Sequence, residues 1–265
     1  MIYNEISEII KNEEIADNIF EAHLSSSKIS RASKAGQFIN ILPEADFEQT
    51  MRRPMSISYQ DNNSLKIIYK AIGVGTKIMK KWEKGDKVDI IGPLGNCWDL
   101  PTKKDALLIG GGVGIAPILN LFNSINTNVN IDLFIGARYG KEHFLKHNPE
   151  DGIYLSTDNG EIGIKGNLFD AINEVFSIKQ MQNKTIYVCG PPILMERIRD
   201  FSIKNSIECY LALETIMACG IGICQGCTLE MKDKEGTEHS YRDKYKLVCI
   251  DGPIFNANEI KTCFL

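Results

Sequence analysis

The stretch Cys219-Gly-Ile-Gly-Ile-Cys-Gln-Gly-Cys227 decides how the C-terminal part of the chain folds, and Cys249 follows it 22 positions later. Three thiols at C-x4-C-x2-C plus one distant thiol is the ligand spacing of a plant-type [2Fe–2S] cluster. A loop that supplies three thiolates must curl around the cluster with its amides turned inward, where they hydrogen-bond the sulfurs. Gly220, Gly222 and Gly226 suit such a loop because glycine adopts backbone angles closed to other residues. The predicted metal ligands are Cys219, Cys224, Cys227 and Cys249.

Other uses of these cysteines fit their spacing less well. A zinc knuckle usually pairs two C-x2-C units, and this chain has one. A disulfide framework is typical of small secreted domains, whereas this chain has 265 residues. Four unrelated buried thiols would not share a glycine-rich loop. The spacing favours the cluster, and a structural zinc site or a chance arrangement stay open as alternatives.

The composition is that of an ordinary globular protein with room for two or three domains. Of its residues, 43% are hydrophobic and 24% are charged, and the net charge of -4 gives no basic footprint for nucleic acid. No apolar stretch reaches the ~18 residues that a membrane span needs. The start, Met1-Ile-Tyr-Asn-Glu-Ile6, lacks the cationic region of a signal peptide. With eight cysteines, we expect metal binding in a reducing compartment, the cytoplasm, without a membrane or nucleic-acid partner.

The first hundred residues consist of short apolar segments separated by turns. In these segments apolar residues alternate with polar ones or follow a glycine turn, which predicts strands. The predicted strands cover residues 2–10, 16–24, 38–41, 65–71 and 87–91. Many short strands at close spacing are typical of an antiparallel barrel.

Two features of this region could hold a phosphate-bearing cofactor. In Arg53-Pro-Met-Ser56, Pro54 biases Arg53 towards an extended backbone, from which the guanidinium can form a forked contact with a pyrophosphate. In Gly73-Val-Gly-Thr76, a glycine turn opens a short helix with Thr76 as the predicted N-cap, so that free amides face an anion. A surface arginine before a strand and an ordinary helix cap remain the alternatives.

From about residue 105 the pattern changes to strands that alternate with helices. Residues 106–109 form a continuous apolar strand, as in a parallel sheet buried on both faces. The run Gly110-Gly-Gly-Val-Gly-Ile-Ala-Pro117 then opens a helix, and strand, glycine turn and helix together make a nucleotide-phosphate site. Pro117 takes the place of the last glycine of a strict dinucleotide fingerprint. Further strands are predicted over 131–135, 152–156 and 185–188, and further helices over 168–176 and 193–201.

Three other features of this half of the chain need an interpretation. Cys189-Gly-Pro191 follows a predicted strand, at the edge where parallel sheets bind ligands, although a small residue at a strand end is also common. His143 and His147 have a metal-capable spacing but no acidic partner, so we predict a solvated turn. The charged run at residues 232–238 is predicted to be a solvated hairpin tip.

In chain order, R-P-M-S, G-V-G-T, G-G-G-V-G-I-A-P, C-G-P-P and the cysteine motif resemble the ferredoxin-reductase superfamily. Within it, M-A-C-G-I-G-I-C-Q-G-C followed by V-C-I-D-G-P-I-F resembles the electron-transfer subunits of type B (NAD-dependent) dihydroorotate dehydrogenase. The resemblance covers nearly the whole chain and implies a multidomain β plus α/β fold. Its parts would be an antiparallel FAD-binding β-barrel over residues 1–100, a parallel-sheet NAD-binding α/β domain over 101–212 and a small C-terminal [2Fe–2S] domain over 213–265.

The resemblance also implies which residues hold each cofactor. Arg53 would contact the diphosphate of FAD, Ser56 would lie near the flavin ring, and Gly75 and Thr76 would hold the diphosphate through their amides. The other residues implied for FAD are Pro54, Met55, Ile68, Tyr69 and Lys70. Those implied to frame NAD are Gly110, Gly111, Gly112, Gly114, Cys189, Gly190 and Pro191.

The activity implied is that of an oxidoreductase subunit with no catalytic acid or base of its own. Electrons would come from dihydroorotate through FMN in a separate catalytic subunit, cross the cluster to FAD and reduce NAD+, as part of pyrimidine biosynthesis. The complex would be a heterotetramer with two copies of each subunit. A flavin and iron–sulfur subunit of another NAD(P)H oxidoreductase, of the ferredoxin:NADP or sulfide type, and a zinc-stapled nucleotide-sensing module stay open as alternatives. The presence of all four cysteines favours the dihydroorotate enzyme, because some relatives replace one by aspartate.

Overall fold

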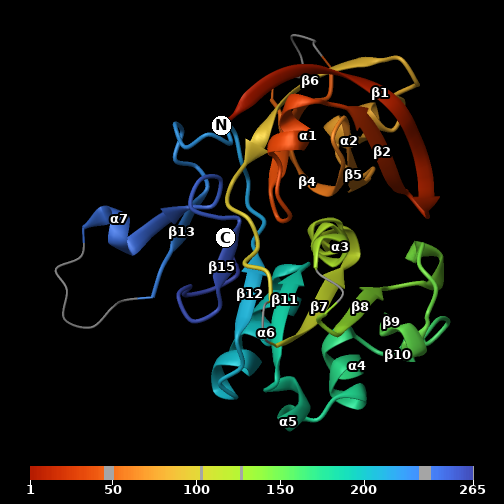
Figure 1. Ribbon diagram of the computed structural model, residues 1–265, viewed down its shortest axis with the longest axis vertical. Helices are drawn as coiled ribbons and strands as arrows, with labels where there is room; N and C mark the ends of the chain where they lie inside the picture. Colours follow the sequence, from red (N-terminus) through yellow and green to blue (C-terminus); the bar gives the residue numbers. More distant parts are fainter. Residues whose placement is uncertain (45–50, 102–103, 126–127, 233–239, 265) are drawn as a thin grey trace.

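The computed structural model describes residues 1–44, 51–101, 104–125, 128–232 and 240–264. A closed antiparallel barrel lies above a mainly parallel α/β sheet in Figure 1, and the C-terminal segment lies beside both. This is the predicted combination of a β-barrel and an α/β sheet. Among the described helices, none is long and apolar enough to cross a membrane.

The barrel closes six strands in the order β1-β2-β5-β4-β3-β6. Inward-facing residues such as Ile9, Leu24 and Ile39 are fully buried in its core, as the alternation of apolar and polar residues predicts. β1 is longer than predicted because it pairs with β2 along one part and with β6 along another. The elements are β1 (Tyr3–Ala16), β2 (Ile19–Ser25), α1 (Lys28–Ala32), β3 (Phe38–Leu42), β4 (Arg53–Gln60), β5 (Ser64–Lys70), α2 (Val74–Met79) and β6 (Lys87–Leu94).

The second sheet has the order β10-β9-β8-β7-β11-β12-β15, and all its neighbouring strands are parallel except β12 and β15. Both faces are covered, which explains the continuous apolar strand: Leu108 packs with Ile118 of α3 on one face, whereas Ile109 packs with Met195 of α6 on the other. The elements are β7 (Asp105–Gly111), η1 (Gly112–Gly114), α3 (Ile115–Ser124), β8 (Ile131–Ala137), η2 (Gly140–Glu142), η3 (Pro149–Asp151), β9 (Ile153–Thr157), β10 (Ile164–Lys165), α4 (Leu168–Val175), α5 (Ile178–Met181), β11 (Lys184–Cys189), α6 (Pro192–Lys204) and β12 (Cys209–Ala212).

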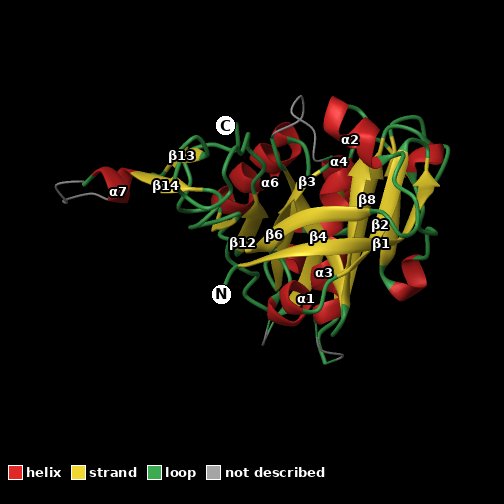
Figure 2. Cartoon of the chain, turned by 90° about the horizontal axis from the view of Figure 1, so that it is seen from above, coloured by secondary structure: helices red, strands yellow, loops and turns green. Residues whose placement is uncertain are grey.

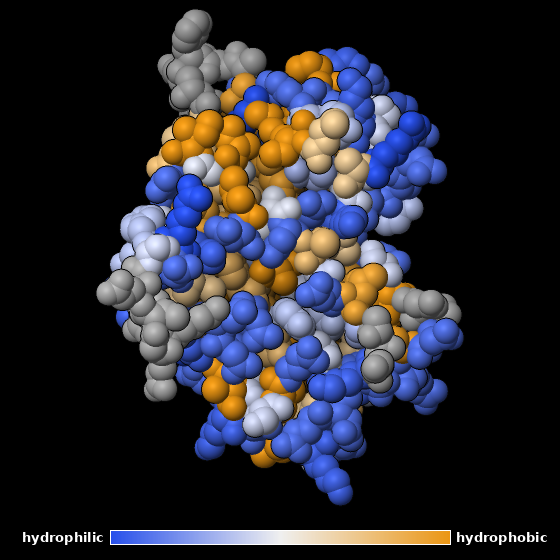
Figure 3. All heavy atoms as spheres, turned by 60° about the vertical axis from the view of Figure 1, so that its left-hand side comes forward, coloured by the Kyte–Doolittle hydropathy of each residue, from blue (hydrophilic) through white to orange (hydrophobic). Residues whose placement is uncertain are grey.

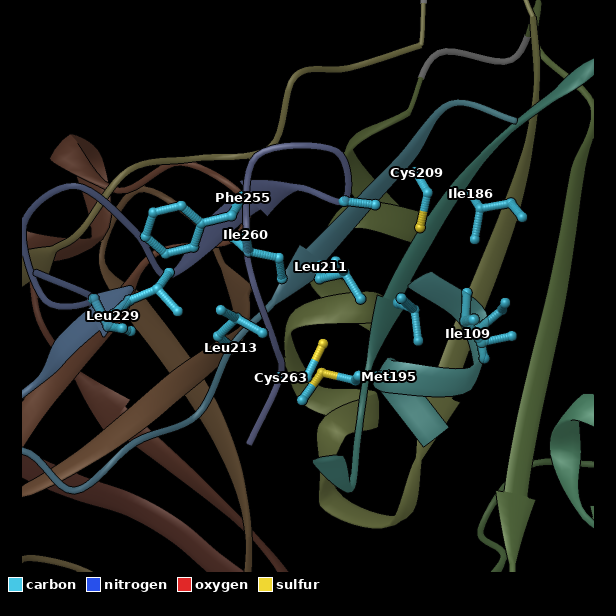
Figure 4. Packing of buried hydrophobic residues seen from close by; sticks show 14 of the residues in the cluster. Ile109, Ile186, Met195, Cys209, Leu211, Leu213, Leu229, Phe255, Ile260 and Cys263 are labelled. Carbon is cyan, nitrogen blue, oxygen red and sulfur yellow. The ribbon is translucent and has the colours of Figure 1, made fainter. Parts of the chain in front are cut away.

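The C-terminal segment is joined to this sheet by a strand and by a common core. β15 (Ile254–Asn256) pairs antiparallel with β12, and Phe255 lies opposite Leu211. Figure 4 shows Leu229, Phe255, Ile260 and Cys263 of the C-terminal segment packed in one cluster with residues of the sheet and α6. The segment therefore shares its core with the nucleotide sheet. The domain boundaries at residues 100 and 212 stay a prediction.

A hairpin of this segment extends from one side of the molecule, as Figure 2 shows. It consists of β13 (Thr228–Glu230), paired antiparallel with β14 (Tyr245–Leu247), and of α7 (Tyr241–Lys244). Apart from Lys232, the predicted hairpin tip lies outside the described residues.

The two histidines of the middle region have a structural role that the sequence did not indicate. His143 is half-buried, and its Nε2 lies 3.0 Å from the carbonyl oxygen of Ser156. His147 is exposed, but its Nδ1 accepts a hydrogen bond of 3.0 Å from the Leu155 amide. Both side chains thus attach the segment after η2 to β9, and of the two histidines of the predicted solvated turn only His147 is exposed.

Candidate functional site

A cavity of about 270 Å³, called here the flavin cavity, opens between the barrel and the nucleotide sheet. It brings together seven of the residues implied for FAD: Pro54, Met55, Ser56, Ile68, Tyr69, Lys70 and Thr76. They come from β4, β5 and α2, which the barrel topology places side by side. Tyr69 lines the cavity, but its ring stacks on Phe20 in the barrel core and its hydroxyl donates to Asn12. The backbone of Tyr69 is therefore better placed than its ring to face a ligand.

Arg53 and Gly75 meet beside this cavity. A Cβ on Gly75 would lie 2.9 Å from Nε of Arg53, so glycine lets the arginine pack closely there. The Arg53 guanidinium donates to the Met51 and Arg52 carbonyls, at 2.8 and 3.1 Å, and has no acidic partner among the described residues. A cation with no counter-ion in the described ranges, held against the first turn of α2, fits an anionic diphosphate.

The predicted cap of α2 needs a correction. The helix begins at Val74 with Gly73 as its N-cap, and Thr76 is the third helical residue. Thr76 Oγ1 accepts hydrogen bonds of 3.1 Å from the amides of Ile72 and Gly73, so it stabilises the turn from inside the helix. The N-cap was predicted at the wrong residue because the true N-cap is a glycine, and a glycine has no side chain that would mark it as a cap in the sequence.

The glycine turn after β7 and the Cys189–Pro191 turn after β11 pack against each other at the carboxyl edge of the sheet. A Cβ on Gly114 would lie 2.6 Å from the Gly190 nitrogen, and one on Gly111 would lie 2.8 Å from Pro191. Gly110 is equally constrained by Ile115, 3.0 Å from its would-be Cβ. The backbones of the two loops therefore lie close enough to frame one ligand, at the edge where parallel sheets bind nucleotides.

Gly112 differs from its neighbours because it is exposed and has a φ of +56°. It turns the chain from β7 into η1 with open space around it. Burial, with the Glu214 carboxylate as a smaller cause, raises the pKa of the Cys189 thiol well above its ordinary range. The Cys189 thiol is therefore neutral, and it lies in the core of the nucleotide sheet.

The cluster loop, residues 219–227, curls as predicted, although not every glycine is needed for its shape. Gly220 and Gly222 have positive φ angles of +70° and +81°, which favour glycine. The third positive φ, +56°, belongs to Gln225 and not to Gly226. The Gly226 amide instead donates to Cys224 Sγ at 3.5 Å. Within the loop, amides therefore do turn towards sulfur.

The four predicted ligands form an outer and an inner pair. Cys224 is exposed and Cys219 half-buried, whereas Cys227 and Cys249 are each only 2% exposed. Burial opposes ionisation of Cys219, but the amides of Cys224, Ile221 and Ile223 outweigh it and lower the pKa of the Cys219 thiol to about 7. Burial and the adjacent Cys227 thiol raise the pKa of Cys249 to about 12.

The number and type of these thiols match the donor set of a two-iron cluster. Among the described residues, no three His, Cys, Asp or Glu side chains are grouped to hold one metal ion. A [2Fe–2S] cluster instead shares four ligands between two irons. Amides directed at sulfur are also the surroundings expected of thiolates that carry charge.

The flavin cavity and the cluster loop are connected by one short segment. Leu213, Glu214, Thr215 and Met217 line the cavity, and Cys219 follows two residues later. Sequence reasoning missed these residues, together with Phe38, Ile72, Val113, Ala116 and Pro253 of the same wall. Glu214 had a usable signal, because it follows the carboxyl end of a strand. Its side chain reaches solvent through the cavity, yet surrounding protein atoms bury it enough to raise its pKa.

An ion pair connects the flavin cavity with the nucleotide sheet. Lys70 Nζ lies 2.5 Å from Oε1 of Glu142 in η2. The other oxygen, Oε2, accepts hydrogen bonds from the amides of Arg138 and Tyr139, at 3.1 and 3.3 Å. Burial raises the pKa of Glu142, but Lys70 and these amides outweigh it and hold the pKa below its ordinary 4.5. One carboxylate thus holds the loop after β8 and a lysine of the barrel.

A larger cavity of about 440 Å³ lies elsewhere, beside β12, β15 and the β13–β14 hairpin. Its wall includes Asp99, Lys246, Asp251 and Glu259, and none of the predicted site residues. The volume of a cavity alone therefore does not identify the functional site. The flavin cavity is the better candidate because the predicted residues converge on it.

Two family models match parts of the chain. The iron–sulfur cluster binding domain of dihydroorotate dehydrogenase B matches residues 214–261, a range that contains all four predicted ligands. The oxidoreductase NAD-binding domain matches residues 108–200, a range that contains both turns at the sheet edge.

Curated relatives match nearly the whole chain. The dihydroorotate dehydrogenase B (NAD(+)) electron transfer subunit of Streptococcus pneumoniae strain ATCC BAA-255 / R6 is 34% identical over 268 residues, 98% of this chain and 99% of that protein. Its counterpart in Fusobacterium nucleatum is 31% identical over 261 residues, 95% of this chain and 96% of that protein. The one in Caldanaerobacter subterraneus subsp. tengcongensis is 30% identical over 254 residues, with the same coverage of 95% and 96%.

Solved structures agree on the fold. A structure of an NADH-dependent reduced ferredoxin-NADP oxidoreductase, described for flavin-based electron bifurcation, superposes with a TM-score of 0.81 at 26% identity and covers 97% of this chain and 90% of that chain. A ferredoxin reductase in carbazole 1,9a-dioxygenase shares the fold, with a TM-score of 0.66 at 16% identity over 78% of this chain and 67% of that chain.

These matches answer the questions of cofactor and class that the sequence left open. An iron–sulfur domain and an oxidoreductase NAD-binding domain, on a flavin-reductase fold, support FAD, a [2Fe–2S] cluster and NAD as the cofactors. The chain is accordingly part of an oxidoreductase, and these matches favour the iron–sulfur interpretation over the zinc-stapled module. The chain belongs to the family of electron transfer subunits of NAD+-dependent dihydroorotate dehydrogenase B.

Proposed function

We propose that this chain carries electrons from a separate, FMN-bearing catalytic subunit that oxidises dihydroorotate, through its [2Fe–2S] cluster and FAD, to NAD+ in pyrimidine biosynthesis. The observation that supports this most is the short segment Leu213–Cys219, which lines the flavin cavity at one end and begins the cluster loop at the other. When bound, the flavin supplies the exchange between one-electron and two-electron carriers. The chain's own contribution is to place the three groups beside one another.

For FAD, we assign the diphosphate to Arg53 and to the first turn of α2, Gly75 and Thr76. The guanidinium beside Gly75 and the amides of a helix start both favour an anion. Ser56 and the cavity-facing parts of Ile68, Tyr69 and Lys70 would then line the flavin ring, with Pro54 and Met55 beside them. A nicotinamide nucleotide would lie between the Gly110–Gly114 and Cys189–Pro191 turns.

For the cluster, we assign one thiolate each from Cys219, Cys224, Cys227 and Cys249. The outer pair is reachable from solvent, and the inner pair is anchored in the core shared with the sheet. Such a division supports a cluster that is held firmly on one side and approached by a partner on the other.

The partner would dock where the outer pair is exposed. Ile216, Ile223 and Ile250 lie around the cluster loop with 87%, 78% and 50% of their surfaces exposed. Ile221, on the same loop, is half-buried against the shared core. Figure 3 shows apolar side chains gathered on the side of the molecule that carries the barrel and the C-terminal segment. We place no dihydroorotate chemistry in this chain. We propose that the complex contains two copies of each subunit. We also propose that it is located in the cytoplasm, where unpaired cysteines are stable.

A second candidate is suggested by the structure that superposes with a TM-score of 0.81, which is of a reduced ferredoxin-NADP oxidoreductase. In that case reduced ferredoxin, and not dihydroorotate, would supply the electrons. Identities of 30 to 34% to dihydroorotate dehydrogenase subunits, against 26% to that structure, favour the first candidate.

The test is to assay the purified chain with and without the catalytic subunit. Alone, it should oxidise NADH with an artificial acceptor and should not oxidise dihydroorotate. With the catalytic subunit, dihydroorotate should reduce NAD+. Cys224→Ser should abolish this coupling while much of the artificial-acceptor activity stays, and Cys97→Ser, outside the four ligands, is the matched control that should keep both. Dihydroorotate turnover by the chain alone, or coupling that survives Cys224→Ser, would contradict the proposal, and coupling with reduced ferredoxin in place of dihydroorotate would favour the second candidate.

A further inference from the structure

Asn40 is a buried polar residue at the contact between the barrel and the cluster loop. It lies on β3 with none of its surface exposed. Its side-chain Nδ2 donates a hydrogen bond of 3.2 Å to the carbonyl oxygen of Cys219, the first residue of the cluster loop. Ile39 and Ile41, its neighbours in sequence, point into the barrel core, so Asn40 faces outward and is buried by what packs on the barrel.

The cluster loop is fitted closely around this side chain. Gly220 has a φ of +70°, and a Cβ there would lie 2.8 Å from Asn40 Nδ2 and 3.4 Å from Leu94. Glycine is thus required twice at this position, for its backbone angle and for the contact with Asn40. The loop therefore rests directly on β3.

The same outward face of β3 reaches the flavin cavity. Phe38, two residues before Asn40 and on the same side of the strand, lines the cavity. The backbone of Asn40 is held as well, because Arg52 Nη1 donates to its carbonyl oxygen at 3.3 Å while Arg52 Nη2 pairs with Asp89 at 2.7 Å. A single braced strand thus contacts the wall of the flavin cavity and the first cluster ligand.

Stability alone does not explain an asparagine at this position. Its Oδ1 is buried and has no hydrogen-bond partner in the described part of the chain. A buried amide oxygen without a partner destabilises a fold, and an apolar side chain of similar volume would avoid that cost. Leu94, also turned towards the loop, shows that apolar residues are accepted there.

We propose that Asn40 is a positioning residue for electron transfer, whose side-chain amide seats the cluster loop on the strand that lines the flavin cavity. The inference rests on the proposed function, since it takes Cys219 as a cluster ligand and the cavity as the FAD site. It goes beyond that function by naming the contact that sets the position of one redox group relative to the other.

The test is Asn40→Leu in the full chain, loaded with FAD and cluster. Thermal stability and FAD retention should be unchanged or higher, because the unpaired amide is removed. Loss of one buried hydrogen bond should shift the loop from the seated to the unseated state by roughly fivefold to tenfold. We therefore expect iron to be lost to a chelator roughly fivefold to tenfold faster, cluster reduction by NADH to slow, and the EPR signal of the reduced cluster to change.

Two further variants separate this role from a general loss of packing. Gly220→Ala pushes on the same contact from the loop and leaves the barrel intact, so it should share the phenotype even if Asn40→Leu fails to fold. Asn120→Leu removes an equally buried amide, which donates to the Ile57 carbonyl at 3.0 Å between α3 and the barrel, and it should leave the EPR signal and iron release unchanged.

The outcomes distinguish this inference from the proposed function. If wild-type protein binds no iron, the proposed function itself fails. The positioning role alone is overturned by a different result. In that result wild type holds the cluster, and Gly220→Ala and any folded Asn40→Leu protein match wild type in iron release, EPR signal and cluster reduction. The same holds if Asn120→Leu disturbs the cluster as much as the variants at the contact.

Discussion

Arg53 is the residue that we assign to the diphosphate of FAD. Its guanidinium packs against Gly75 and donates to two backbone carbonyls, without an acidic partner among the described residues. Arg53→Ala should therefore weaken FAD binding, because hydrogen bonds to charged groups contribute ~1.5–3 kcal/mol, or roughly tenfold to a hundredfold in Kd. Titration of the flavin-free protein with FAD measures this. Arg31→Ala is the control, since Arg31 bonds Asn62 and Asn63 at the barrel surface; equal Kd values for wild type and Arg53→Ala would exclude the assigned role.

At the scale of single residues, sequence reasoning can select candidates where the chemistry is local. Residues such as Ser56 and Thr76 could be selected because a short motif carries its own backbone geometry, and they do line one cavity. Glu214 and Asn40 were missed because their roles arise from contacts between distant segments: Asn40 meets Cys219 from the other end of the chain. No local pattern marks such a contact.

The Lys70–Glu142 pair belongs to the scale of elements, because it joins β5 to η2. Glu142 has a lowered pKa, so its contribution to stability is present above its unfolded pKa near 4.5 and is lost as the pH falls through the lower folded value. Glu142→Gln should lower Tm at pH 7 by about 2–4 °C, as expected for ~1 kcal/mol in a chain of this size. The difference from wild type should shrink as the pH falls below 4.5.

Melting curves at several pH values check this, with the neighbouring pair as control. Lys141 of η2 lies 3.0 Å from Asp17 in the turn between β1 and β2, but both side chains are at least half exposed. Asp17→Asn should therefore change Tm little, because exposed ion pairs are screened by solvent. A Glu142→Gln difference that stays constant down to acid pH would rule out ionisation of Glu142 as its cause.

The same scale marks the limit of what sequence pattern predicts about the fold. The barrel and the parallel sheet can be predicted from alternating or continuous apolar runs, because such runs indicate directly which residues are buried. Residues 106–109 are an example. β15 has only three residues, and it forms because β12 offers an open edge; its pairing depends on the rest of the sheet. The union of the C-terminal segment with the nucleotide sheet could therefore not be predicted from its own residues.

At the scale of the whole molecule, the flavin cavity and the cluster loop are built from segments that lie far apart in the sequence. The barrel comes first in sequence, yet the flavin cavity is closed by residues 213–217 near the other end. The cluster loop then lies on the outer side of β3, and its Cys224 is exposed. In the proposed function, an electron would enter at the outer cluster cysteines from the partner and continue towards the flavin cavity.

This arrangement makes Ile223 the residue on which docking of the catalytic subunit should depend most. It is 78% exposed and directly precedes Cys224, and Ile250 packs against the adjacent Gly222. Ile223→Lys should weaken assembly by about tenfold, because a charge would be buried in an apolar contact. Iron content, FAD content and NADH oxidation with an artificial acceptor should stay at wild-type levels. Ile178→Lys, at a 47% exposed isoleucine of α5 far from the cluster loop in Figure 1, should assemble normally. Titrating the catalytic subunit against dihydroorotate-dependent NAD+ reduction measures both, and an unchanged half-saturation for Ile223→Lys would move the docking surface away from the cluster loop.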